Sequence, residues 1–97
     1  MSKTYRYQTR GTCSSAITFT LNDDGTLTNV SFTGGCNGNT QGICHLIEGM
    51  SAEEVVKRCA GIRCGFKPTS CPDQLSRALR AALTDGNGLT QLDTDSL

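Results

Sequence analysis

The cysteines of this chain are the residues best suited to chemistry. There are six among 97 residues, at Cys13, Cys36, Cys44, Cys59, Cys64 and Cys71. Cys64 and Cys71 share the segment Gly61–Asp73 (GIRCGFKPTSCPD) with both prolines of the chain and with the start of a predicted helix. Four thiolates at tetrahedral spacing bind zinc or an iron–sulfur cluster, and paired thiols exchange electrons. The spacing of Cys64 and Cys71 is looser than that of a Cys-x-x-Cys pair, so the two residues alone are a weak metal signal. A site of four thiolates needs two further sulfurs from elsewhere in the chain.

A β-hairpin is predicted over residues 15–33. Apolar residues alternate with threonines along its first strand, and an Asn-Asp-Asp-Gly run marks the turn. A two-residue turn at Asp24-Gly25 places Ile17 opposite Phe32. In this register the apolar residues of both strands share one face, whereas a slip of one residue would split them between two faces.

The same register brings two cysteines together at the open end of the hairpin. It pairs Cys13 with Cys36, and directly opposed residues have Cβ atoms about 4.5–5.5 Å apart. A bulge at Gly34-Gly35 would shift this pairing by one residue but keep the two sulfurs close. We therefore predict that these two cysteines join Cys64 and Cys71 in one cluster.

Cys71 is predicted to lie in the first turn of a helix that runs to about Leu83. Ser70 is the predicted N-cap, and Pro72 follows in the first turn, where its missing N–H costs nothing. Backbone N–H groups and the helix dipole favour a thiolate at this end, which suits a metal ligand or a nucleophile. Asp73 is predicted to serve as a capping residue of the same turn.

The remaining candidates have simpler explanations. Cys44 and Cys59 lie on the inward faces of two predicted helices, where buried cysteine is ordinary core filler. The helix that carries Cys44 has an apolar side formed by Ile43, Leu46, Ile47 and Met50. His45, the one histidine, is predicted to lie at the surface or partly buried, and becomes a ligand only if its helix turns toward the cysteine cluster.

Composition and charge limit the class of protein. The length fits one domain, and with 36% apolar residues and no Trp its core is thin, so a disulfide or a metal is a common addition. Nine basic and nine acidic residues give a formal net charge of zero without a basic cluster that stands out, so we expect no nucleic-acid binding. No apolar run predicts a membrane span, and the N-terminus has no signal core. We expect a cytoplasmic protein, in which cysteines serve metal or redox chemistry.

The predicted fold class is α+β. It consists of an antiparallel meander of two to three strands with two to three helices packed on one face. Residues 3–10 are predicted as a short edge strand ahead of the hairpin. Residues 1–83 are predicted to form a single domain, and residues 84–97 a disordered tail because of their polar, glycine-containing composition.

Several sequence blocks occur in order along the chain: GTCS at 11–14, GGCNGN at 34–39, LIEGM at 46–50, GIRCGFKP at 61–68 and TSCPD at 69–73. These blocks resemble the TSCPD-domain family, and in particular a small stand-alone branch described as uncharacterised four-cysteine proteins. The resemblance covers about residues 4 to 83. It implies that the four family cysteines are Cys13, Cys36, Cys64 and Cys71, with Cys44 and Cys59 as extras.

The resemblance also implies a functional setting. Related TSCPD segments occur at the ends of cobalamin-dependent ribonucleotide reductases, which implies a link to ribonucleotide reduction through metal binding or electron delivery, with a reductase as the protein partner. The chain has no room for the reductase barrel, its radical cofactor site or its substrate pocket. A reductase activity of its own is therefore not expected.

The function that we expect is a non-enzymatic metal-binding module that acts as an accessory or interaction domain. Its ligands would be the four clustered cysteines, and zinc is preferred to an iron–sulfur cluster. One alternative is a thiol–disulfide electron carrier for a ribonucleoside-diphosphate reductase, in which Cys71 attacks and Cys64 or Cys36 resolves. The other alternative is a disulfide-stapled binding domain.

Overall fold

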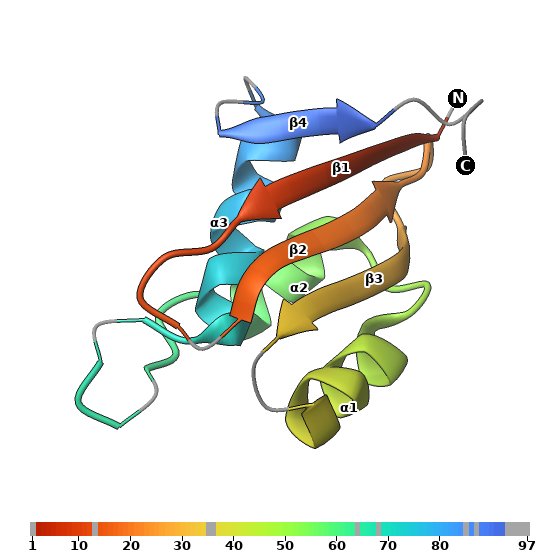
Figure 1. Ribbon diagram of the computed structural model, residues 1–97. Helices are drawn as coiled ribbons and strands as arrows, with labels where there is room; N and C mark the ends of the chain where they lie inside the picture. The colour runs from red at the N-terminus through yellow and green to blue at the C-terminus, as the bar shows by residue number, and fades with distance from the viewer. Residues whose placement is uncertain are drawn as a thin grey trace.

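The described part of the chain is an α+β fold with one antiparallel sheet and three helices. The computed structural model describes residues 2–12, 14–34, 37–63, 65–67, 69–84, 86 and 88–92. The elements in chain order are β1 (Lys3–Gln8), β2 (Ser14–Leu21), β3 (Leu27–Gly34), α1 (Asn37–Ile47), α2 (Ala52–Cys59), α3 (Cys71–Leu83) and β4 (Leu89–Leu92). The sheet order is β3-β2-β1-β4, and α2 and α3 pack together behind it, while α1 lies along β3 (Figure 1). The predicted fold class is confirmed, with one strand more than predicted.

The additional strand is β4, which lies in the stretch predicted to be disordered. Residues Leu89–Leu92 pair antiparallel with β1, with Tyr7 opposite Leu89 and Thr4 opposite Leu92. For these four residues the prediction of disorder is wrong. The prediction that residues 3–10 form an edge strand is also wrong, because β1 has β2 on one side and β4 on the other.

The β2–β3 hairpin has the predicted register in its middle but not near its turn. Ile17 pairs with Phe32 as predicted, whereas Leu21 pairs with Leu27 where a two-residue turn would give Thr28. The loop has three residues rather than two, because the Asn22 N–H donates to the Thr26 carbonyl at 2.9 Å. Such loops need a left-handed residue at their third position, and Gly25 supplies it with φ +87°.

A β-bulge in β3 compensates for the longer turn. The register shifts between Thr18 and Thr20, and within this stretch Asn29 has φ +56°, the one non-glycine residue of positive φ in the described chain. Asparagine tolerates this conformation better than most residues do. The Asn29 N–H donates to Glu48 Oε1 at 3.0 Å, which ties the bulge to the end of α1. Because the bulge restores the predicted register, Ile17 and Phe32 meet on the same face of the sheet.

A second shift lies at the open end of the hairpin. Ser14 pairs with Gly34 and Ala16 with Thr33, so β2 has one extra residue there. The predicted pair of Cys13 and Cys36 lies outside the described residues.

One core joins the sheet to all three helices. It contains Ile17, Phe19, Leu27 and Val30 from the sheet, Ile47, Ala52, Val55 and Cys59 from α1 and α2, and Leu75, Ala78 and Leu79 from α3. The apolar spacing of α3 predicts an inward stripe of Leu75, Ala78, Leu79, Ala82 and Leu83. Its first three members are core residues and Ala82 packs against the core, whereas the prediction is wrong for Leu83, which is 41% exposed. On α1 the apolar pattern predicts burial wrongly at one position. Leu46 and Ile47 follow Ile43 by three and four residues, which are both spacings of one helix face, yet Ile47 is buried and Leu46 is 79% exposed.

Replacing the left-handed residue of the bulge tests this register. We expect Asn29→Val to lower the free energy of unfolding by about 1–2 kcal/mol, because a β-branched residue is strained at positive φ, and Asn29→Gly to leave it nearly unchanged. Urea unfolding followed by circular dichroism gives both values. Ser31→Val, at an exposed position of the same strand, is the matched control and should change stability by less than about 0.5 kcal/mol. Equal losses in Asn29→Val and Ser31→Val would contradict the bulge.

Candidate functional site

The N-terminus of α3 is held by a cap of the predicted kind. Ser70 Oγ accepts the Asp73 N–H at 3.2 Å, and Pro72 occupies the first turn. The same hydroxyl donates to the Ile62 carbonyl at 2.6 Å, so the cap also fixes the preceding loop to the helix. This loop, residues 61–70, is called the α2–α3 loop below. The predicted start of the helix is confirmed.

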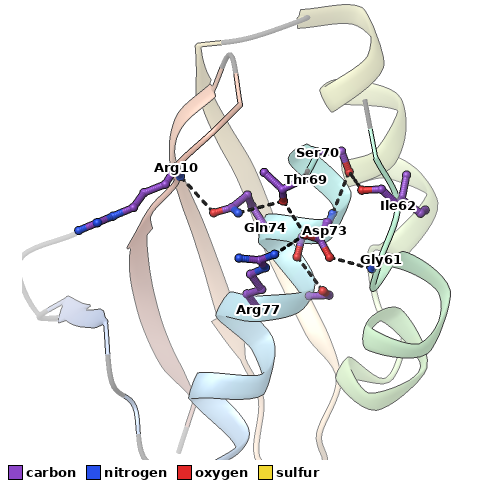
Figure 2. Close-up of polar contacts among 9 residues, drawn as sticks. Arg10, Gly61, Ile62, Thr69, Ser70, Asp73, Gln74 and Arg77 are labelled. Carbon is purple, nitrogen blue, oxygen red and sulfur yellow. Dashed lines mark hydrogen bonds and ion pairs between the residues drawn. The ribbon is translucent and has the colours of Figure 1, made fainter. Parts of the chain in front are cut away.

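Asp73 does more than the predicted capping. Its carboxylate is buried, with 5% exposure, and accepts the Gly61 N–H at 2.7 Å and the Thr69 hydroxyl (Figure 2). Arg77 Nη2 lies 3.2 Å from the same carboxylate. Two ends of the α2–α3 loop and the second turn of α3 therefore meet at one buried charge.

Electrostatics favour the ionised form of this carboxyl group. Burial by itself raises the pKa of Asp73, but the hydrogen bonds from Thr69 and Gly61 and the charge of Arg77 outweigh it and hold the pKa below the ordinary value. The group is therefore ionised at neutral pH and accepts hydrogen bonds through both oxygens.

Gln74 extends this network to the sheet. Its side chain is only 2% exposed, and its Nε2 donates to Thr69 Oγ1 at 3.0 Å. Its Oε1 accepts the Arg10 N–H at 3.1 Å, from the β1–β2 loop (Figure 2). The same loop approaches closely at Gly11, where a Cβ would lie 3.1 Å from Thr69 Cγ2 and where φ is +76°. We call Arg10, Gly61, Thr69, Asp73, Gln74 and Arg77 the Asp73 network.

Cys71 is the one cysteine of the predicted cluster that the structure describes. Its partly buried Sγ lies 3.2 Å from Ser14 Oγ, a hydroxyl that is itself buried at the start of β2. Ser14 Oγ is also 3.0 Å from Thr12 Oγ1. The residues on either side of position 13 thus lie at the first turn of α3.

The other three predicted ligands, Cys13, Cys36 and Cys64, lie outside the described residues, so their prediction is not tested. Contacts of their described neighbours converge on the same place. Ser14, which contacts Cys71, pairs with Gly34 at the end of β3, and Ile62 is bonded to Ser70. The β1–β2 loop, the end of β3 and the α2–α3 loop lie at one end of the molecule, beside the start of α3 (Figure 1).

Cys44 and Cys59 belong to the core, as predicted. Cys59 is a buried core residue and Cys44 packs against the core from α1. Burial raises the pKa of both thiols, and for Cys44 the nearby charge of Glu48 raises it further, so both remain protonated at neutral pH. His45 is exposed, in line with its predicted surface position. Within the described ranges, no three His, Cys, Asp or Glu residues gather closely enough to hold a metal ion.

Sequence reasoning missed the buried polar residues of the network. Neither Thr69 nor Gln74 is predicted to have a structural role, although both are almost fully buried. A signal was present for Gln74, since it precedes Ala78 by one helical turn and so lies on the apolar stripe of α3. A polar residue on such a stripe needs buried partners.

Comparison with known families shows the family to which the chain belongs. The model of the TSCPD domain matches residues 2–83, which is most of the chain. The chain belongs to the TSCPD domain family. No curated protein and no solved structure matches it. In the part of the chain that the structure describes, no helix has the length and apolar character that crossing a membrane requires.

The five residues of the TSCPD motif, Thr69–Asp73, have different structural roles in this domain. Ser70 caps the helix, the proline starts it, and Thr69 and Asp73 fasten the α2–α3 loop to it. Cys71 contributes to none of these structural contacts and instead presents its sulfur to Ser14. Four residues of the motif therefore build the turn that positions the fifth.

Neutralising Asp73 should weaken this turn in a pH-dependent way. We expect Asp73→Asn to lower the free energy of unfolding by about 1–3 kcal/mol at neutral pH, because it removes charge-assisted hydrogen bonds from a buried site. The pKa of Asp73 is lowered in the folded state, so its contribution is complete above the unfolded value of about 3.9 and is lost as the pH falls through the folded value. Urea unfolding measured across this range should show the two proteins converging at acidic pH.

Glu53→Gln is the control for this experiment, since Glu53 is an exposed carboxylate of α2. It should cost less than about 0.5 kcal/mol at any pH. A stability difference between wild type and Asp73→Asn that stays constant down to strongly acidic pH would refute the assigned role of the charge.

Proposed function

We propose that this TSCPD domain is a four-cysteine metal-binding accessory module, with zinc preferred to an iron–sulfur cluster. The ligands would be Cys13, Cys36, Cys64 and Cys71. The observation that supports it most is the convergence of described contacts on Cys71. Its Sγ meets Ser14, Ser14 pairs with Gly34, and the neighbouring Ser70 holds Ile62.

The surroundings of Cys71 suit a thiolate ligand. The Ser14 hydroxyl, 3.2 Å from the sulfur, can donate a hydrogen bond to it, and a donor of this kind orients a ligand and offsets its charge. The first turn of a helix adds backbone N–H groups and the positive end of the dipole. Arg63 and Lys67, on both sides of position 64, add positive charge against the negative charge of four thiolates.

A structural metal would also add stability to a domain whose apolar core is thin. Metal affinity becomes folding free energy when the site exists only in the folded state. Zinc is preferred because it needs only a closed tetrahedral set of thiolates and supplies stability without redox chemistry. The role would then be to shape an accessory or interaction surface. The resemblance of the sequence blocks implies a link to ribonucleotide reduction, and the proposal includes that link.

The second candidate is a thiol–disulfide electron carrier for such a reductase. The partly buried Sγ of Cys71, at a helix N-terminus with a hydroxyl beside it, favours this reading as well. In that role the Cys71 thiolate attacks a partner disulfide, and Cys64 or Cys36 resolves the mixed disulfide. The domain gives up two electrons and two protons, and the partner becomes a dithiol.

Elemental analysis separates these functions. Protein purified without a chelator should contain about one zinc per chain if the first proposal is right. Cys36→Ser, Cys64→Ser and Cys71→Ser should each lose the metal and several kcal/mol of stability, because the ion stabilises only the folded chain. Cys44→Ala is the matched control and should keep the metal.

Other results would favour the alternatives. A visible absorption band with iron would indicate a cluster, and a metal-free protein with a reversible dithiol titration near the cytosolic potential would indicate the carrier. Four oxidised cysteines, with loss of the fold under reductant, would indicate a disulfide-stapled domain. Loss of the metal in Cys44→Ala would mean that the wrong four cysteines were assigned.

A further inference from the structure

An apolar groove lies on the helical side of the domain. It has a volume of about 350 Å³ and runs from α1 across α2 to the start of α3. Its walls include Leu46, Ile47, Met50, Arg58, Ile62 and Pro72, and Arg58 is the one charged residue among all the residues that line it. The groove is thus an apolar hollow with a single cation at its side.

Two walls of the groove expose large side chains that the fold does not cover. Leu46 is 79% exposed and Ile62 is 44% exposed, although the spacing of Leu46 on α1 is that of a residue meant for burial. Covering a leucine or isoleucine fully is worth about 1.5–3 kcal/mol per side chain. An occupant that covers both residues would therefore gain a substantial part of its affinity from them.

The sequence segment that contains Arg58 and Ile62, two residues of the groove wall, carries an excess of positive charge. Lys57, Arg58, Arg63 and Lys67 lie within eleven residues that contain no acidic side chain, in a protein whose formal net charge is zero. The pair of Arg58 with Glu54, at 3.7 Å and exposed on both sides, is a weak one. Four separated cations are too few for a nucleic-acid surface but suffice to select an acidic peptide.

We propose that this groove binds an acidic amphipathic helix of a partner protein. Apolar side chains one helical turn apart would cover Leu46 and Ile62, and carboxylates beside them would face Arg58 and Arg63. The proposal goes beyond metal binding, because it uses none of the four predicted ligands. Since Pro72 is part of the groove wall, the partner would lie next to Cys71.

Other occupants fit the groove less well. In a symmetric dimer this face would meet its own copy, which would place Arg58 and Arg63 of two chains together and cost affinity through like-charge repulsion. An anionic membrane surface also attracts cations, but it has no protruding side chain to fill the hollow that Leu46 and Ile62 border.

Peptide binding tests the proposal. The probe is a fluorescein-labelled synthetic helix of about four turns with leucines on one face and glutamates elsewhere, and its partner is the same peptide with lysine in place of glutamate. Fluorescence anisotropy should show the acidic peptide binding at least about tenfold more tightly than the basic one, with affinity that falls as salt rises.

Substitutions then locate the site. Leu46→Ser and Ile62→Ser should each weaken binding about tenfold, whereas Leu83→Ser should not, although Leu83 is 41% exposed and so nearly matches Ile62. Arg63→Gln should weaken binding and reduce its salt dependence, with Arg80→Gln on the exposed side of α3 as the control. Circular dichroism and metal analysis of the same samples show whether a variant that binds the peptide weakly has lost its fold or its metal rather than its contacts in the groove.

Several outcomes would overturn the groove assignment. These are no binding of the acidic peptide, equal binding of the basic peptide, or equal losses in Leu83→Ser and Ile62→Ser. Sedimentation that shows a dimer broken by Leu46→Ser would assign the groove to a second copy. Co-sedimentation with phosphatidylserine vesicles, abolished by the same variant while no peptide binds, would assign it to a membrane. A metal-free protein that still binds the acidic peptide would keep this inference and remove the zinc proposal.

Discussion

A buried carboxylate determines how this domain holds the start of α3 and the loop before it. The ionised Asp73 must receive hydrogen bonds because an uncompensated charge in a protein interior is very costly. Gly61 and Thr69 provide them from the two ends of the α2–α3 loop, and Arg77 provides the balancing charge from α3. The loop can therefore lie in few other positions without leaving that charge unpaired. Cys71, two residues before Asp73, has its position fixed as a consequence.

The same network connects two parts of the chain that are far apart in sequence. Gln74 accepts from Arg10 and donates to Thr69, so the β1–β2 loop is joined to the helix start by polar contacts rather than by apolar packing. This arrangement suits a small domain whose apolar core lies between the sheet and the helices. A metal at the proposed site would act on a scaffold that the hydrogen bonds already arrange. The apolar groove on the helical side adjoins the same end of α3, since Pro72 is part of its wall.

Sequence patterns predicted the features of the fold that depend on short segments of the chain. Alternation placed Ile17 opposite Phe32, and the cap residues placed the start of α3 at Cys71, because both depend on a few adjacent residues. The three-residue turn escaped prediction because its register error is cancelled farther along by Asn29, a compensation that needs both ends of the hairpin. Strand β4 was missed because a polar segment becomes a strand here through pairing with β1, about 80 residues away.

In the candidate site, too, local features could be predicted from the sequence and long-range contacts could not. The position of Cys71 followed from helix capping, and the burial of Cys59 followed from periodicity. The exposure of Leu46 could not be predicted, because periodicity identifies an apolar face but not whether another element covers it. The roles of Thr69 and Gln74 required contacts across the fold. The clustering of Cys13, Cys36 and Cys64 around Cys71 rests on the sequence register and on the contacts of their neighbours, and it stays a prediction.

X-ray absorption at the zinc K-edge of the purified protein tests the central claim most directly, because it reports the atoms around the metal in solution. If the start of α3 gathers four cysteines, the first shell should consist of four sulfurs at about 2.3 Å. A first shell dominated by nitrogen or oxygen at about 2.0–2.1 Å would place any bound zinc elsewhere, and would contradict the account of this end of the molecule.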